Sequence, residues 1–247
     1  MGGPGRPRRP RAPAGGVIIY GRNPVREAIR GPRAVARVWA TRNAAREPWL
    51  EGVRVTVTGA EEVERLAGSP SHQGMCAAVE AFRYAEQDTA LGRPDPLIVV
   101  LDQVQDPQNL GAICRTAECA GAAAVVIPER RSAEVTPAVC KASAGAVEHL
   151  PVVRVRNLAD FLHAARGAGV WCYGADARGQ VGYDEVDYGG SVAVVLGGEG
   201  RGLRPRVAAA CDALVAIPLR GRTDSLSVSA AAAIMLYAVD RRRRFSA

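Results

Sequence analysis

Three polar segments hold most of the side chains that could do chemistry. The first follows an apolar run at 97–102 and places Asn109 near an expected helix start, with Arg115 six residues further on. An amide and a guanidinium can both bind a ligand oxygen, and the guanidinium stays charged at neutral pH. Taken alone, Asn109 could be only a helix cap, and Arg115 could be only a solvated side chain.

The second segment is rich in glycine and follows another apolar run. Gly197, Gly198, Gly200 and Gly202 lie within six residues, with Glu199 between two of them. Glycine allows positive φ and close approach of the backbone to a ligand. The spacing matches neither a dinucleotide-binding fingerprint nor a P-loop. Glu199 could bond a ligand or a helix N-terminus, and a merely flexible loop is the alternative.

The third segment joins an expected strand ending at Ile217 to an alanine-rich helix. It carries Leu219, Ser225, Leu226 and Ser227. A strand end, a loop and a serine-rich helix start expose N–H groups and hydroxyls that could bind an adenine or a carboxylate. Ser225 could equally be only the cap of the helix.

Alternating strands and helices are expected to position these segments. Near-continuous apolar strands separated by helices predict a mostly parallel sheet covered on both faces, an α/β fold. In such a sheet ligands bind beyond the carboxyl ends of the strands, where all three segments begin. The expected strands are 97–102, 124–127, 150–153, 170–174, 192–196 and 213–217, and the expected helices are 110–120, 137–144, 158–165, 204–210 and 228–241.

The N-terminal third has a different composition. Residues 1–15 are mostly Gly, Pro and Arg, which predicts a disordered basic arm. Residues 16–83 predict a small α/β domain, 84–96 a linker, and 97–247 the larger domain. The small domain is expected to have strands at 17–20, 37–40, 53–57 and 75–81, a helix at 25–30 capped by Asn23, and a helix opened by a capping box of Thr58 and Glu61.

Charge is unevenly distributed along the 247 residues. The chain has a net charge of +7, but the two arginine-rich ends carry +4 each and residues 55–240 carry −6. This distribution of charge is typical of a chain in which one part binds phosphates and another part has a different function. Arginine-rich tails that only aid solubility are the alternative. No apolar run approaches the length of a membrane span, so we expect a cytoplasmic protein. Six scattered cysteines without a CxxC pair predict reduced, buried thiols and no metal site.

Together the three segments closely resemble the signature motifs of the SpoU (TrmH) branch of the SPOUT RNA methyltransferases. The matching stretches are N-L-G-A-I-C-R-T-A at 109–117, V-L-G-G-E-G-R-G-L at 195–203 and I-P-L-R-G-R-T-D-S-L-S-V-S at 217–229. The N-terminal part is similar to the small L30e-like substrate-binding domain of the two-domain 23S ribosomal RNA members, through Y-G-R-N-P-V at 20–25 and S-H-Q-G at 71–74.

The resemblance implies a trefoil-knotted catalytic domain that binds S-adenosylmethionine and works as a homodimer. It implies no metal. The reaction would be methyl transfer to a ribose 2′-hydroxyl of RNA, with Arg115 orienting and activating the hydroxyl. Asn109 and Glu199 would position Arg115 and the substrate, and Ser225 would lie at the edge of the pocket. The residues implied for cofactor binding are Gly197, Gly198, Gly200, Ile217, Leu219, Leu226 and Ser227.

The implied target is ribosomal RNA, most specifically a guanosine of 23S rRNA. The same chemistry on tRNA, or on another rRNA nucleotide including one where methylation confers antibiotic resistance, is the alternative. The third motif usually reads S-L-N-V-S, whereas this chain has Ser227 in place of the asparagine. Because serine has a shorter reach and fewer donors than asparagine, a non-catalytic RNA-binding or ribosome-assembly factor on the same fold stays open.

Overall fold

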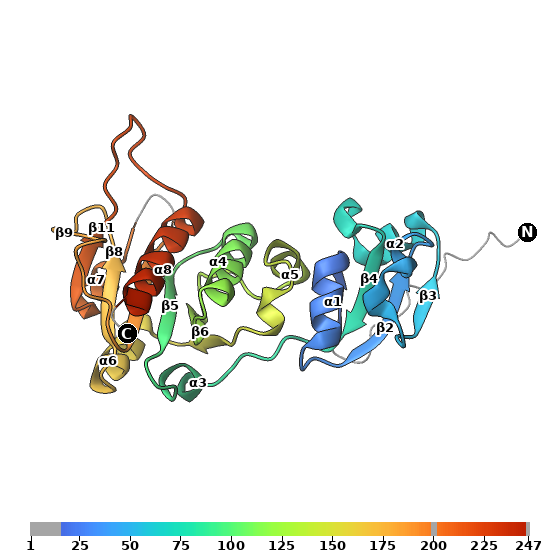
Figure 1. Cartoon of the computed structure of the whole chain (residues 1–247), viewed down its shortest axis with the longest axis horizontal. Coiled ribbons are helices and arrows are strands. Elements are labelled where there is room, and N and C mark those ends of the chain that lie inside the picture. Colours follow the sequence, from blue (N-terminus) through green and yellow to red (C-terminus); the bar gives the residue numbers. More distant parts are fainter. Residues whose placement is uncertain (1–15, 199–201, 246–247) are drawn as a thin grey trace, which may run out of the picture. The chain divides into compact units, whose positions relative to one another are not determined.

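The computed structural model describes residues 16–198 and 202–245. The expected basic arm at 1–15, and Glu199 and Gly200 of the second segment, lie outside this part of the chain. The protein divides into two compact units, one ending at Phe82 and the other beginning at Arg83 (Figure 1). Each unit has its own sheet.

The first unit is a four-stranded mixed sheet in the order β1-β4-β2-β3. β4 is antiparallel to both β1 and β2, whereas β3 is parallel to β2. Helix α2 covers Trp39 and Cys76 on one face. The strands and helices of this unit are β1 Val17–Tyr20, α1 Arg22–Arg30, β2 Val35–Ala40, β3 Val55–Val57, α2 Ala60–Ala67 and β4 Met75–Val79.

Glycines begin both helices of the first unit, and the two predicted caps are wrong. α1 starts directly after Gly21, whose φ of 98° turns the chain out of β1 and whose carbonyl accepts from Val25 N. Asn23 therefore lies inside the helix. α2 starts after Gly59 because the N–H of Thr58 is still bonded to the neighbouring strand at Ala40 O. Backbone pairing has overridden the capping-box pattern at this position.

The second unit contains a seven-stranded sheet in the order β7-β6-β5-β10-β8-β11-β9, and all its pairings are parallel. The predicted fold class, a parallel α/β sheet after a small α/β domain, is confirmed. The knot stays a prediction of the resemblance. The strands of this unit are β5 Leu97–Asp102, β6 Ala124–Pro128, β7 Val152–Val155, β8 Trp171–Ala175, β9 Val181–Gly182, β10 Val192–Gly197 and β11 Ala213–Ala216.

Helices cover both faces of this sheet. Alternate residues of each strand, such as Ile98 and Val100 of β5, pack against α6 and α7 on one face. On the other face α8 packs on β10, α4 packs on β6, and these two helices contact each other (Figure 1). The helices of this unit are α3 Gln87–Leu91, α4 Pro107–Cys119, α5 Pro137–Ala142, α6 Leu158–Gly167, α7 Pro205–Ala210 and α8 Val228–Phe245.

Local structure departs from the sequence-based boundaries at several places. The segment 84–96, expected to be a linker, forms α3, and Ala85 N donates to Val152 O of the large unit. β7 begins two residues later than expected because it follows Pro151, which has no N–H to donate. The short edge strand β9 was not predicted from the sequence. α4 begins three residues early, because the Asp106 carboxylate accepts from Gln108 N and caps it.

The last helix runs on through the arginines that were expected to form a C-terminal tail. Three of them bind oxygens of the chain itself. Arg242 donates to Asp184 O, Arg243 donates to Pro96 O and Gly190 O, and Arg244 pairs with Asp240 one turn earlier. Burial lowers the pKa of Arg243. Cations at a helix C-terminus also interact favourably with its dipole.

Four of the six thiols are buried, and none of the six, all of which lie in the described part of the chain, forms a disulfide bond. The exceptions to the prediction of burial are Cys119, which is exposed, and Cys211, which is half-buried. Burial raises the pKa of Cys114 to about 12, so this thiol is protonated at neutral pH. Among the helices of 16–198 and 202–245, none is long and apolar enough to cross a membrane.

The contact between α4 and α5 leaves no room for a side chain at Gly111. A Cβ there would overlap the Ala142 methyl group and lie 2.9 Å from Ser143 N. We predict that Gly111→Ala lowers the free energy of unfolding by about 1–3 kcal/mol, because the two helices must move apart. In a thermal melt this corresponds to about 2–4 °C for each kcal/mol.

Gly167→Ala is the matched control, because a Cβ at this helical glycine of α6 meets open space. It should leave the melting temperature unchanged or raise it slightly. Equal melting temperatures for the two variants would contradict the tight helix contact.

Candidate functional site

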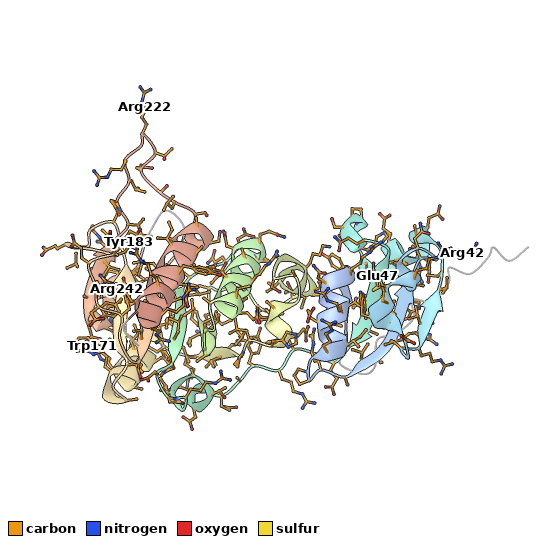
Figure 2. All side chains as sticks on the ribbon, viewed as in Figure 1. Arg42, Glu47, Trp171, Tyr183, Arg222 and Arg242 are labelled. Carbon is orange, nitrogen blue, oxygen red and sulfur yellow. The ribbon has the colours of Figure 1, made fainter. Side chains whose placement is uncertain are left out.

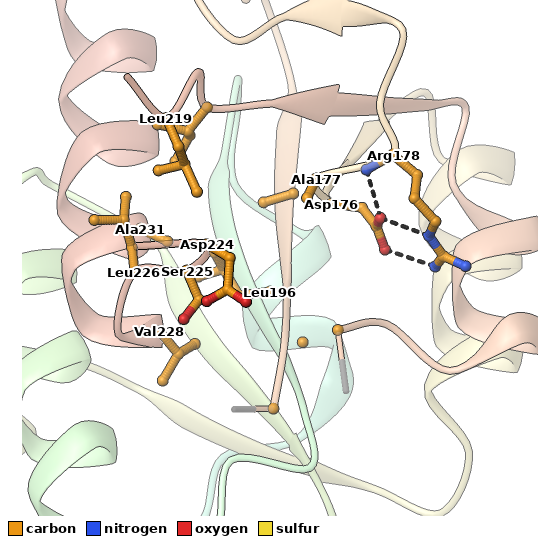
Figure 3. Close-up of a pocket in the computed structure, with 15 residues that line it drawn as sticks. Asp176, Ala177, Arg178, Leu196, Leu219, Asp224, Ser225, Leu226, Val228 and Ala231 are labelled. Atoms are coloured by element: carbon orange, nitrogen blue, oxygen red, sulfur yellow. Dashed lines mark hydrogen bonds and ion pairs between the residues drawn. The ribbon is translucent and has the colours of Figure 1, made fainter. Parts of the chain in front are cut away.

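A cavity of about 390 Å³ lies where β8, β10 and β11 end (Figure 3). Its position beyond the carboxyl ends of parallel strands is the one where α/β sheets bind ligands. The second and third sequence segments meet in it, as predicted. Its lining residues are Ala175, Asp176, Ala177, Arg178, Leu196, Gly197, Gly198, Gly202, Ile217, Leu219, Asp224, Ser225, Leu226, Val228 and Ala231.

The glycines in its wall are required by close backbone contacts. A Cβ on Gly197 would lie 2.6 Å from Leu203 N and closer still to the carbonyl group of Gly202. A Cβ on Gly198 would lie 2.8 Å from Gln103 O. Gly202 has a φ of 62°, which favours glycine, and its N–H donates to Gly198 O. Gly197, Gly198 and Gly202 therefore present bare backbone to the cavity.

A buried carboxylate ties the first segment to the second. Asp102, at the end of β5 and beside Gly197 in the sheet register, is 1% exposed. Its Oδ2 accepts from Arg204 N at 2.9 Å and its Oδ1 accepts from Arg204 Nε at 2.7 Å. Because Arg204 is two residues after Gly202, this two-point contact fixes the path of the chain just after the glycine-rich segment. The sequence analysis did not single out either residue.

A second, more polar cavity of about 400 Å³ adjoins the first. Gly198, Gly202 and Val228 line both cavities, so they form a common wall. The second cavity also contains Asn109, which lies in the first turn of α4 rather than at its cap. The Asn109 Nδ2 donates to Asp106 Oδ2 at 3.3 Å. Its remaining lining residues are Gln103, Val104, Gln105 and Asp106.

An ion pair that was not predicted from the sequence lies in the wall of the first cavity, where Asp176 is next to Gly202. The carboxylate of Asp176 accepts from Arg178 N, Nε and a terminal guanidinium nitrogen at 2.8–2.9 Å (Figure 3). Hydrogen bonding from Arg178 lowers the pKa of Asp176. This carboxylate is therefore charged at neutral pH. The sequence did contain a signal for this ion pair. Asp176 follows the apolar strand β8 directly, and Arg178 is two residues further on.

The third segment forms a loop that projects from the body of the large unit, with Arg222 on it (Figure 2). Ser225 and Asp224 at its base line the first cavity, as does Leu226. Ser227 does not line it. Its hydroxyl accepts from Ala230 N at 3.2 Å and so caps α8, the function considered for Ser225 in the sequence. Serine and asparagine are both favourable N-caps, so the substitution in this motif preserves a capping side chain.

Arg115 does not line either cavity of its own chain. It is exposed on α4, and within the described part of the chain it has no ion pair. Glu199 and Gly200 lie outside the described residues. Of the predicted cofactor-binding residues, the structure brings together Gly197, Gly198, Ile217, Leu219 and Leu226.

Comparison with known proteins agrees with this arrangement. Residues 96–237 match the SpoU rRNA methylase family, and residues 18–85 match a domain described as RNA 2′-O ribose methyltransferase substrate binding. A protein of Bacillus subtilis named TrmH family tRNA/rRNA methyltransferase YacO is 34% identical, with 91% of this chain and 95% of that protein covered.

Two solved structures share the fold over nearly the whole chain. The SpoU methyltransferase AviRb of Streptomyces viridochromogenes, in complex with AdoMet, has a TM-score of 0.79 and 27% identity, covering 95% of this chain and 92% of its own. An AdoMet-bound rRNA methyltransferase of Sinorhizobium meliloti has a TM-score of 0.77 and 27% identity, covering 92% and 88%. The fold and the site thus define an RNA methyltransferase that uses S-adenosylmethionine. The chain belongs to the SpoU (TrmH) family.

Crowding at Gly197 provides a test of the first cavity. We predict that Gly197→Ala weakens the binding of S-adenosylmethionine at least about tenfold, because the added methyl group displaces the backbone of Gly202 that forms the cavity wall. Isothermal titration calorimetry gives the dissociation constant. Gly221→Ala is the control, since a Cβ on this glycine of the projecting loop meets open space. Wild-type affinity in Gly197→Ala would mean that the glycine turn does not shape the cofactor site.

Proposed function

We propose that this protein methylates a ribose 2′-hydroxyl of RNA, most specifically a guanosine of 23S rRNA. The observation that carries the proposal is the common wall of Gly198, Gly202 and Val228 between the two cavities. A cofactor in the first cavity and a nucleotide at the second would face each other across this wall. Methyl transfer needs this proximity, because the hydroxyl oxygen must approach the methyl carbon in line with the bond that breaks.

The first cavity has the size and chemistry to hold S-adenosylmethionine. Its volume lies in the range of small-molecule sites. Leu219, Leu226 and Ile217 offer apolar contacts that suit an adenine ring. The backbone exposed at Gly197 and Gly198 offers hydrogen bonds at close range, where a side chain would block access. When bound, the cofactor supplies a methyl carbon made electrophilic by its sulfonium sulfur.

The residues of this chain would bind, orient and activate the nucleophile. Asn109 at the second cavity would hold a ribose or phosphate oxygen, and Ser225, in the wall of the first cavity, would lie at the edge of the reacting centre. The guanidinium of Arg115 would stabilise negative charge developing on the 2′-oxygen. Because an arginine stays protonated, the 2′-hydroxyl proton would pass to water as the oxygen bonds the methyl carbon and the carbon–sulfur bond breaks, leaving S-adenosylhomocysteine as the second product. We assign Glu199 the positioning of Arg115 and the substrate.

A second copy of the chain would complete the site. Arg115 is exposed and lies outside both cavities of its own chain, which supports its acting in the site of a partner. Leu219 and Leu226 of the loop before α8, and Tyr237 of α8 itself, are large apolar residues that are 39%, 42% and 47% exposed. Association as a homodimer would cover such apolar surface.

Two observations support ribosomal RNA as the substrate. The N-terminal unit matches an RNA substrate-binding domain, and the solved relative from Sinorhizobium meliloti is named an rRNA methyltransferase. Folded RNA is recognised largely by shape and by single-stranded loops, a task for a second domain. The relative from Bacillus subtilis is named for both tRNA and rRNA, so tRNA is the competing substrate.

Arg115→Ala should lower kcat by about 100-fold or more, because a charged group at the developing oxyanion is lost. The dissociation constant for S-adenosylmethionine should stay within about twofold of wild type. Arg93→Ala, which removes an exposed arginine before β5, is the control. Full turnover in Arg115→Ala would refute the assigned function of this residue.

Complementation tests the partner contribution directly. Arg115→Ala and Gly197→Ala chains, produced together, should form mixed dimers in which one site has an intact cofactor cavity and receives the partner's intact Arg115. At a cofactor concentration well below the dissociation constant of Gly197→Ala, about a quarter of all sites would then be active. Activity no higher than that of the separate variants would place Arg115 in the site of its own chain.

The substrate is tested by mapping 2′-O-methyl positions in rRNA and tRNA from cells with and without the gene. We expect one guanosine of 23S rRNA to lose its methyl group when the gene is deleted, and to regain it after incubation of the purified rRNA with the protein and S-adenosylmethionine. Loss of a methyl group from tRNA alone would establish the competing substrate.

A further inference from the structure

A cleft of about 610 Å³ lies at the same edge of the large sheet as the two cavities, beyond the carboxyl ends of β6 and β7. The loop after β6, the N-terminal turn of α6 and the first turn of α7 form its walls. Its most conspicuous feature is five arginines among its lining residues, namely Arg130, Arg131, Arg156, Arg204 and Arg206.

Most of this positive charge is not neutralised by the protein. Arg204 is paired with Asp102, whereas Arg130, Arg131, Arg156 and Arg206 are exposed and form no ion pair within residues 16–198 and 202–245. Those parts of the chain contribute no acidic side chain to the lining of the cleft. Two exposed acids, Glu129 and Asp160, adjoin lining residues in the chain, but neither lines the cleft. Like charges gathered in this way repel one another, so they favour binding of an anion.

The arginines at the end of α8 provide an internal comparison. Arg242, Arg243 and Arg244 donate to carbonyl or carboxylate oxygens of the protein. Their hydrogen-bonding capacity is therefore partly used within the fold. The unpaired arginines of the cleft have their hydrogen-bond donors available for a ligand. The sequence alone does not distinguish these two groups of arginines.

The position of the cleft relates it to methyl transfer. Arg204 in its wall is two residues after Gly202, which lines both cavities. Two residues span at most about 7 Å, so the cleft begins within the length of about one nucleotide from the cavity wall. The N-terminus of α6, capped by the side chain of Asn157, adds the positive end of a helix dipole.

We propose that this arginine cleft binds the RNA phosphate backbone next to the nucleotide that is methylated. A guanidinium forms paired hydrogen bonds with a phosphate, and four such groups along one cleft suit the successive charges of a nucleic-acid strand. The inference rests on the proposed function, because it takes RNA as the substrate. The new element is the path of the RNA strand that flanks the methylated nucleotide, which would run from the polar cavity at Asn109 past Arg204 toward Arg156.

The test uses the full chain with Arg130 and Arg156 both replaced by alanine. Arg93→Ala with Arg241→Ala is the matched control, because both arginines are exposed and form no ion pair in the described part of the chain. Arg93 precedes β5, and Arg241 lies near the end of α8, where Arg243 donates to Pro96 O, so both charges are removed from the opposite edge of the sheet. Binding of a fluorescein-labelled, single-stranded 20-nucleotide RNA is measured over a series of KCl concentrations. Methylation of unmodified 23S rRNA transcript and calorimetric binding of S-adenosylmethionine are measured in parallel.

For the cleft variant we expect RNA binding about tenfold weaker and a salt slope, log Kd against log [KCl], smaller by about 1.4 than in wild type. KM for the transcript should rise about tenfold with kcat within twofold, and cofactor affinity should stay unchanged. The control should behave as wild type.

Equal affinities and salt slopes for the cleft variant and the control would overturn the proposal. The binding result is separable from the proposed function. If wild type transfers no methyl group to the transcript but the cleft variant shows the weaker binding and the smaller slope, the cleft proposal stands and the assigned substrate fails.

Discussion

The contact between Asp102 and Arg204 is the constraint on which the geometry of the site depends. A carboxylate that is 1% exposed is costly to bury unless its oxygens are hydrogen-bonded, and here each oxygen accepts one bond from Arg204. The two residues are 102 positions apart, at the end of one central strand and just past the glycine turn that follows its neighbour. Because the bond is made in part to the backbone, it fixes the path of the chain as well as a side chain. The wall common to both cavities is held at this point.

Small residues and capping side chains also shape the cavity wall that the Asp102–Arg204 contact holds in place. Gly197 and Gly198 let the turn lie against Leu203 and Gln103 without an intervening side chain. Ser227 begins α8 beside the cavity, and its cap orients the residues on either side, Leu226 and Val228, toward the ligand space. Replacement of the usual asparagine therefore leaves the start of the helix intact. Ser227, whose presence in place of asparagine was the reason to consider a non-catalytic function, still provides the side-chain cap of α8.

Much of the fold could be predicted from the sequence because its signals are local. Apolar strands such as β5 and β10 and the helix cap at Asn157 follow from patterns a few residues long. The pairing of Asp102 with Arg204 could not, since it depends on which distant strands become neighbours. Asn23 was predicted as a cap from residue type, but Gly21 begins the helix because of its positive φ. The exposure of Arg115 outside its own cavities is likewise a property of the assembled helices. No local pattern specifies it.

The strands β5 and β10 are neighbours at the centre of the large sheet but are far apart along the chain. β5 pairs with β10 through residues such as Leu97 and Val192, and roughly half of the large unit is threaded between them as β6, β7, β8 and their helices. Closing so long an interval is slow, and during synthesis it cannot start until β10 has left the ribosome. Until then, the backbone N–H and C=O groups along one edge of β5 have no partner strand. An RNA methyltransferase of this topology completes the cavity beyond β10 only in the last stage of its own translation, so shortened chains never acquire it.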